Sequence, residues 1–197
     1  LAYRRGDGLG GFGPEEFYVA GAGPERVLAA DLDGDRFPDL VIDGQKRLTI
    51  VYANRWEPSV YCTAKTNSCG TQPAIGATGD ASASASSGFV VAAQATKALK
   101  SGLFIYTDRG HAGLPFQGGT LCLRTPIKRS IVLTDTGGTP GNCDGSLAID
   151  MNAFAAGALG GNPAPFLVVP GTRVNGQFWA RDTFAHGSLL SDAVQYV

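Results

Sequence analysis

Glycine and proline interrupt this chain too often for long helices to form. There are 28 glycines and 11 prolines among 197 residues, well above the roughly 12% that these two types make up in an average protein. Charged residues account for only 17%, against about 25% in an ordinary soluble domain. Because glycine and proline bend the chain and end regular elements, this composition favours short strands joined by turns over a helix bundle.

The charges are nearly balanced, with 16 basic and 17 acidic side chains. A protein that binds nucleic acid normally carries a basic surplus, so this class of partner is disfavoured. No run of residues approaches the roughly 18 apolar residues of a membrane helix, so we expect no membrane span.

The acidic residues concentrate near the N-terminus. Residues 1–57 hold ten acids and seven bases, whereas residues 58–197 hold seven acids and nine bases. No glutamate occurs after Glu57. The change in composition predicts two domains, 1–57 and 58–197.

Four aspartates crowd into the segment DLDGDRFPD, which begins at residue 31. Asp31, Asp33, Asp35 and Asp39 occupy positions 1, 3, 5 and 9 of a loop, and so many carboxylates repel one another unless a cation lies among them. Hard oxygen ligands at flexible spacing select Ca²⁺ over the transition metals. The backbone carbonyl of Phe37, at position 7, would be a further ligand. The sequence therefore predicts a calcium site, with a metal-free acidic turn as the alternative.

The loop does not match an EF-hand. Arg36 and Ile42 stand where that motif needs glycine and glutamate. Apolar runs at 27–30 and 40–42 flank the loop instead of helices, so we expect it to connect two strands.

The stretch GDGLGGFGPEEFYVAGAGPERVLAADLDGDRFPDLVI, which begins at Gly6, resembles an FG-GAP (VCBS-type) repeat, the blade unit of integrin-like β-propellers. The resemblance covers residues 1–55 and implies a Ca²⁺ ion held by Asp31, Asp33, Asp35, Asp39 and the carbonyl of Phe37. Arg36 departs from the usual glycine. Because blades pack on their neighbours, residues 1–57 would be the tail of a longer repeat array. Docking on the second domain or on a neighbouring subunit is the alternative.

The four cysteines are Cys62, Cys69, Cys122 and Cys143. The chain has no CxxC motif and only two histidines, which argues against a zinc site. An even cysteine count in a chain rich in glycine, threonine and serine suggests two disulfides and an oxidising compartment. Three pairings are open. Pairing of nearest neighbours, Cys62 with Cys69 and Cys122 with Cys143, is favoured, and four free thiols are the alternative.

Short apolar runs bounded by turn residues predict the strands of the second domain. They lie at 88–95, 102–106, 119–124, 130–134, 147–151, 165–169 and 174–180. The alternating alanine and serine of 79–88 are also read as a strand or strand edge rather than a linker. Only 151–159 and 190–193 suggest helix. The predicted fold is all-β: a propeller-blade-like calcium repeat followed by an antiparallel β-sandwich or jelly-roll-like domain.

The second domain resembles a C-terminal module of large secreted proteins from bacteria such as planctomycetes and myxobacteria. The likeness rests on residues 114–119, Cys122, 177–182 and 190–193. It implies an extracellular bacterial setting and no particular chemistry.

No catalytic set stands out in residues 58–197. A glycosidase carboxylate pair would have to come from seven aspartates that all suit turns or solvent-facing positions. The GxSxG elbow of a serine hydrolase is absent, as is a phosphate-binding loop. His111 and His186 are the only candidate histidine bases. We therefore expect a protein that is not an enzyme.

Trp179 and Arg181, in the segment QFWARD, are the candidate ligand-binding residues, since an exposed tryptophan stacks on sugars or anchors partners. The alternative is structural, with Phe178 inside and an ion pair between Arg181 and Asp182.

The sequence favours a secreted or cell-surface protein, stabilised by Ca²⁺, with a structural or adhesive role. Its partners would be further copies of itself, in an extracellular fibre or layer, or an extracellular protein or glycan. The alternatives are a carbohydrate- or protein-binding accessory module and the C-terminal appendage of a secreted hydrolase.

Overall fold

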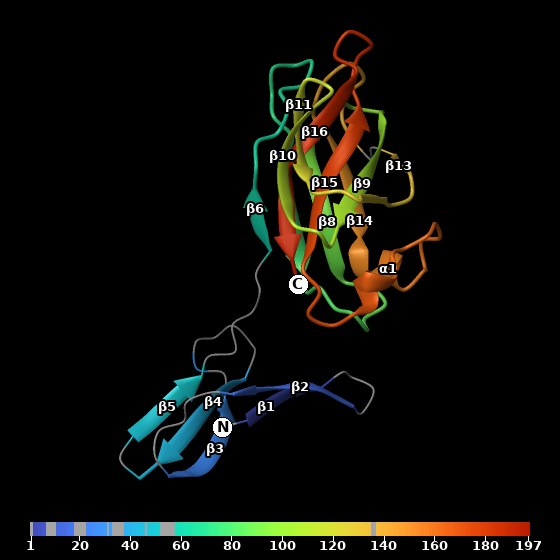
Figure 1. Cartoon of the computed structure of the whole chain (residues 1–197). Helices are drawn as coiled ribbons and strands as arrows, with labels where there is room; N and C mark the ends of the chain where they lie inside the picture. The colour runs from blue at the N-terminus through green and yellow to red at the C-terminus, as the bar shows by residue number, and fades with distance from the viewer. Residues whose placement is uncertain are drawn as a thin grey trace. The chain divides into compact units, whose positions relative to one another are not determined.

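The computed structural model describes residues 2–6, 11–17, 23–30, 32, 38–45, 47–51, 58–134 and 137–197. The chain divides into two compact units, Leu1–Glu57 and Pro58–Val197, which are described separately below (Figure 1). The structure is nearly all β, with 51% strand and 5% helix, so the predicted fold class is confirmed. Within the ranges given above, no helix is long and apolar enough to cross a membrane.

The described strands of the first unit form two antiparallel sheets. Strands β1 (Ala2–Gly6) and β2 (Phe12–Phe17) form a pair. Strands β3 (Pro24–Ala30), β4 (Asp39–Gly44) and β5 (Arg47–Val51) form a sheet in the order β3-β4-β5. The apolar runs 27–30 and 40–42 therefore lie on adjacent strands, and the predicted calcium loop connects them.

The two faces of the β3-β4-β5 sheet differ in burial. Ile42 is fully buried on one face. On the opposite face Leu28, Val41 and Ile50 lie side by side across the three strands. Leu28 and Ile50 are exposed there and Val41 is half-buried, so this face presents an apolar row to its surroundings.

The second unit is built on two antiparallel sheets. The larger has the order β12-β9-β15-β16-β6, and β13 also pairs with β9. Its strands are β6 (Ser59–Tyr61), β9 (Ser101–Thr107), β12 (Lys128–Arg129), β13 (Leu133–Thr134), β15 (Val174–Arg181) and β16 (Ser188–Tyr196). The smaller sheet has the order β14-β8-β7, formed by β7 (Ala74–Gly79), β8 (Phe89–Thr96) and β14 (Gly145–Asp150). Helix α1 (Met151–Ala155) and the 3₁₀ helix η1 (Pro165–Val168) complete it together with one hairpin.

One hydrophobic core contains side chains from both sheets, which is the packing of a sandwich. Its largest fully buried members are Phe89, Val91, Phe104, Tyr106, Leu147, Phe154, Phe178 and Leu189. In β14, Leu147 and Ile149 are buried while Ala148 between them is exposed. This alternation is the half-buried strand that the sequence predicted at 147–151.

The hairpin of β10 (His111–Phe116) and β11 (Gly119–Leu123) lies over the outer face of the large sheet (Figure 1). Gln177 of β15 connects the two layers and is fully buried. Its amide nitrogen donates to the carbonyl of Thr120 at 3.1 Å, and its amide oxygen accepts from the backbone nitrogen of Cys122 at 3.2 Å. The hairpin is thus hydrogen-bonded to the sheet.

Three local predictions are wrong, and of the strand predicted at 130–134 only the last two residues form a strand, β13. Strand β7 ends at Gly79, and 80–88 form bends and loop, because alanine and serine supply no large side chains to bury. Side chains form hydrogen bonds with the backbone of that loop instead. For example, Oδ1 of Asn152 accepts from the backbone nitrogen of Ser82 at 3.0 Å. Residues 165–168 are a 3₁₀ helix that begins at Pro165. Residues 190–193 lie within β16, and the helix suggested at 151–159 is confined to α1.

The two disulfides join Cys62 to Cys122 and Cys69 to Cys143. All four cysteines are therefore paired, but the predicted nearest-neighbour pairing is wrong. Cys62 directly follows edge strand β6, and the hairpin over the sheet brings Cys122 to it. Contact across the folded sheet, rather than proximity along the chain, selects the partners.

Each disulfide closes a long loop, with sequence separations of 60 and 74 residues. In the chain-entropy account, closing a loop of this length stabilises the folded state by about 4 kcal/mol. Closing the shorter loops of the nearest-neighbour pairing would stabilise it less. Two disulfides of this kind indicate an oxidising compartment.

Candidate functional site

The predicted calcium ligands fall mostly outside the described residues. Asp31, Asp33, Asp35 and Phe37 lie outside them, and Asp39 is the first residue of β4. The Asp39 side chain is fully buried, and its Oδ2 accepts from the backbone nitrogen of Leu32 at 2.9 Å. Asp39 therefore lies beside the second residue of the predicted loop.

A buried carboxylate at the end of this loop fits a site for a hard cation. No group of three or more histidine, cysteine, aspartate or glutamate residues gathers within the described part of the chain.

The candidate ligand-binding residues lie at the C-terminal end of β15. Trp179 is half-buried, and its indole nitrogen donates to Oε1 of Gln117 at 2.9 Å. Arg181 is exposed, whereas Phe178 is fully buried. Phe178 thus lies inside, as the structural alternative predicted, but the carboxylate of Asp182 binds other partners than Arg181.

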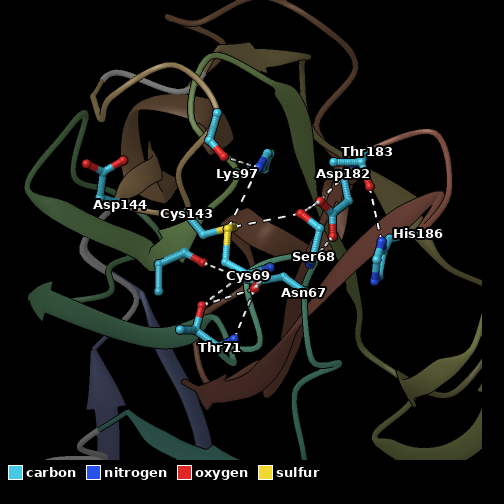
Figure 2. The surroundings of a disulfide bond; sticks show 12 residues. Asn67, Ser68, Cys69, Thr71, Lys97, Cys143, Asp144, Asp182, Thr183 and His186 are labelled. Atoms are coloured by element: carbon cyan, nitrogen blue, oxygen red, sulfur yellow. Dashed lines mark hydrogen bonds between the residues drawn. A yellow bond between two sulfur atoms is a disulfide. The ribbon is translucent and has the colours of Figure 1, made fainter.

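Asp182 joins the end of β15 to the loop that follows β6 (Figure 2). Ser68 donates twice to it, from Oγ to Oδ1 at 2.5 Å and from its backbone nitrogen to Oδ2 at 2.8 Å. The backbone nitrogen of Thr183 donates to Oδ1 at 2.7 Å. Burial alone would raise the pKa of Asp182, but these hydrogen bonds and the neighbouring His186 outweigh it and hold that pKa below its ordinary value.

The turn between β15 and β16 is closed by its own backbone. The nitrogens of His186 and Gly187 both donate to the carbonyl of Thr183, at 3.1 and 2.8 Å. The hydroxyl of Thr183 lies 3.1 Å from Nδ1 of His186 (Figure 2). Phe184, on this turn, is completely exposed, at 106% of the reference area. The turn therefore holds an aromatic ring in solvent on a hydrogen-bonded backbone.

Lys65 connects this turn to the β10–β11 hairpin. Its ammonium group donates to the carbonyls of Gln117, His186 and Ser188 at 2.6, 2.9 and 2.8 Å. The three carbonyls satisfy all three donors of the ammonium. The end of the hairpin, which carries Gln117, and the β15–β16 turn, which carries Phe184, thus lie next to each other.

The Cys69–Cys143 disulfide lies beside Ser68 and has a cation next to it (Figure 2). The ammonium of Lys97 is 3.7 Å from Sγ of Cys69 and also donates to the carbonyl of Gly141. Only 8% of Lys97 is exposed. The sulfur therefore has a buried positive charge as a neighbour.

Other aspartates of the second unit also bind backbone nitrogens. Asp150 caps α1 through Ala153 at 3.0 Å and accepts from Gly88 at 2.7 Å. Asp192 accepts from the nitrogen of Ile75 at 2.6 Å, and Asp144 from that of Thr139 at 2.9 Å. Burial raises the pKa of Asp192, whereas the bond from Thr139 lowers that of Asp144.

The two histidines do not form a nucleophile–base pair with Ser68. His111, at the start of β10, stacks on Tyr61 with ring centroids 3.8 Å apart, and its Nε2 is 2.8 Å from Oε1 of Gln195. Burial raises the pKa of the Tyr61 hydroxyl. The contact of His186 is with the hydroxyl of Thr183. Among the described residues, Ser68 is thus paired with a carboxylate and not with an imidazole.

Sequence reasoning did not find Lys65, Ser68, Lys97 or Phe184. For the first three no local signal exists, since their partners are distant in sequence. Phe184 had one: it is the large apolar residue of the segment DTFAHG, which runs from Asp182 to Gly187 between the strand predicted at 174–180 and the helix suggested at 190–193. An aromatic residue in a turn between strands has no core to enter.

Comparison of the chain with protein-family models, curated proteins and solved structures finds no match.

Proposed function

We propose that this chain is a non-catalytic, extracellular structural or adhesive module in which a Ca²⁺-binding repeat precedes a disulfide-bonded β-sandwich. The observation that carries the proposal is the use of carboxylates in the sandwich. Asp144, Asp150, Asp182 and Asp192 each accept hydrogen bonds from backbone nitrogens. A carboxylate engaged in this way fixes a loop and is poorly placed to transfer protons to a substrate.

The two disulfides support the extracellular assignment. They tie together segments that are 60 and 74 residues apart, and such crosslinks persist in oxidising surroundings. The oxidising compartment that best suits a structural or adhesive module is the cell exterior.

The apolar row of the first unit, formed by Leu28, Val41 and Ile50, supports a structural role. Exposed apolar surface on a small sheet favours packing against another protein surface. A further copy of the chain, or another repeat, would cover it, and Ca²⁺ bound between β3 and β4 would hold the two strands in register.

Assembly of the purified whole chain tests this function. With Ca²⁺ present, wild type should form higher-order particles in sedimentation and negative-stain electron microscopy, and Leu28→Asp should reduce them. Val132→Asp is the matched control, because Val132 is 70% exposed in the second unit. Monodisperse monomers at high concentration, or an equal loss of particles in both variants, would count against the proposal.

A second candidate function is a carbohydrate-binding accessory module, and Phe184 is the observation that favours it. Phe184 is fully exposed on the turn that Lys65 ties to the carbonyl of Gln117, and the Gln117 side chain accepts from the indole of Trp179. Aromatic rings on a fixed backbone suit stacking on sugar rings.

Pull-down of the protein by insoluble cellulose, chitin and xylan tests this second function. Wild type should bind one of them, and Phe184→Ala should weaken binding at least several-fold while leaving the thermal unfolding midpoint unchanged. Phe17→Ala is the control, because Phe17 is 77% exposed in the first unit. Absence of binding to all three polysaccharides would exclude this function and leave the structural one standing.

A further inference from the structure

The two disulfides lie in different surroundings. In Cys62–Cys122, Cys62 is exposed, whereas Cys122, on strand β11 of the hairpin, is fully buried. In Cys69–Cys143, Cys69 is exposed and Cys143 is half-buried. Each disulfide therefore has one exposed cysteine, and the two differ in the partner cysteine, which is fully buried at Cys122 and half-buried at Cys143.

A fixed positive charge lies beside Cys69–Cys143. The ammonium of Lys97 is 3.7 Å from Sγ of Cys69, and its bond to the carbonyl of Gly141 holds it in place (Figure 2). Because Lys97 is 92% buried, water screens its charge only weakly. A cation next to sulfur stabilises the thiolate over the thiol.

The carboxylates near this disulfide are already bonded elsewhere. Asp144 accepts from the backbone nitrogen of Thr139 and Asp182 from Ser68. The neighbour of Cys143 is the hydroxyl of Ser68, with Oγ 4.0 Å from Sγ. The positive charge therefore lies nearest Cys69, and the two sulfurs are unequal.

We propose that Cys69–Cys143 is an exchangeable disulfide, a site of covalent modification by thiols, in which Cys69 is the leaving sulfur. A thiolate of the incoming reductant attacks Sγ of Cys143. The bond between the two cysteine sulfurs breaks, and its electron pair leaves on Cys69 as a thiolate beside Lys97. With a monothiol the product is a mixed disulfide at Cys143. With a dithiol the second thiolate displaces Cys143, so the dithiol is oxidised to its disulfide and both cysteines are reduced.

Opening this disulfide removes a covalent tie but leaves hydrogen bonds across the same junction. The nitrogen of Ala98 donates to the carbonyl of Asn142 at 3.1 Å, and Nδ2 of Asn67 donates to the carbonyl of Ala95 at 2.9 Å. The bonds from Ser68 to Asp182 also remain. Exchange should therefore be local and reversible, with the sandwich still folded.

Limited reduction of the folded whole chain tests the proposal. The protein is treated with dithiothreitol under native conditions, quenched with N-ethylmaleimide at timed intervals and mapped by mass spectrometry. Cys69 and Cys143 should be labelled well before Cys62 and Cys122. Equal rates for the two disulfides, or earlier labelling of Cys62 and Cys122, would overturn the proposal.

Two variants test the role of the charge. Lys97→Met should slow reduction of Cys69–Cys143 on the order of threefold or more, whereas Lys97→Arg should keep the wild-type rate. Lys100→Met is the control, since Lys100 is exposed and should leave the rate unchanged. An undiminished rate in a folded Lys97→Met protein would refute the charge effect.

The direction of attack is tested in wild type, which avoids any folding defect of a variant. Brief exposure to reduced glutathione followed by acid quenching should trap the glutathione adduct on Cys143, with Cys69 as the free thiol. An adduct predominantly on Cys69 would show that Cys143 is the leaving sulfur and would contradict the assignment.

Discussion

Ser68 and Asp182 are 114 residues apart in the sequence and form a two-pronged contact, in which the hydroxyl and the backbone nitrogen of Ser68 each bind one carboxylate oxygen. The contact ties the loop after β6 to the end of β15. It also fixes the base of the turn that carries Phe184, because Thr183 donates to the same carboxylate.

Removing the charge of Asp182 should make stability less dependent on pH. The pKa of Asp182 is lowered in the folded protein, so its contribution is present above the unfolded value of about 3.9 and is lost as pH falls through the folded value. Asp182→Asn should melt below wild type at pH 7, and the difference should shrink below about pH 4. Thermal unfolding by circular dichroism between pH 7 and pH 2 measures this.

Asp108→Asn is the control for that experiment. Asp108 pairs with the exposed guanidinium of Arg109, and exposed ion pairs contribute little to stability, so Asp108→Asn should melt close to wild type at pH 7. A constant gap between wild type and Asp182→Asn across the whole pH range would contradict the prediction.

Lys65→Met should destabilise the second unit by about 1–3 kcal/mol, because three carbonyls lose a charged donor. The apolar stem is nearly retained, so the loss reports on the ammonium group. Urea unfolding measures the free energy. Lys128→Met, at an exposed position on edge strand β12, is the comparison and should fall within about 0.5 kcal/mol of wild type.

Gly176→Ala should be strongly destabilising. A Cβ at this position of β15 would fall 1.9 Å from Cζ of Phe104 in the buried core. Overpacking of this kind costs about 1–3 kcal/mol or more, because both strands must shift. Gly113→Ala on β10 is the matched strand control, since a Cβ there meets nothing within 4 Å. Chemical denaturation should separate the two variants, and equal midpoints would contradict the packing argument.

Calcium should stabilise the first unit selectively. At a Ca²⁺ concentration 100 times the dissociation constant, binding to the folded state adds about 2.7 kcal/mol. Hydrogen exchange followed by mass spectrometry should show slower exchange in β3 and β4 on adding Ca²⁺ and none of that protection in Asp33→Asn. An unchanged exchange pattern, together with no heat of binding in calorimetry, would refute the calcium site.

Strand positions in the second unit could be predicted well because they depend on local patterns. The alternation of Leu147, Ala148 and Ile149 encodes one buried and one exposed face, and the apolar run at 174–180 coincides with most of β15. At 80–88, where the side chains are small, the alternation of alanine and serine did not distinguish strand from loop. Backbone bonds to Asn152 and Asp150 then favoured the loop.

Much less of the candidate site could be predicted from the sequence. Trp179 and Arg181 were found by their residue types, but the groups around them were not. Lys65 and Gln117 come from other parts of the chain, and nothing in their local sequence marks them.

The sequence by itself determined the all-β class and the placement of most strands of the sandwich, because the spacing of glycine, proline and apolar residues acts over a few neighbouring positions. Only the tertiary structure decided that Cys62 joins Cys122 and that Ser68 meets Asp182. Such pairs depend on which strands become neighbours and in what register. Burial of the whole core sets those relationships, and no short segment encodes them.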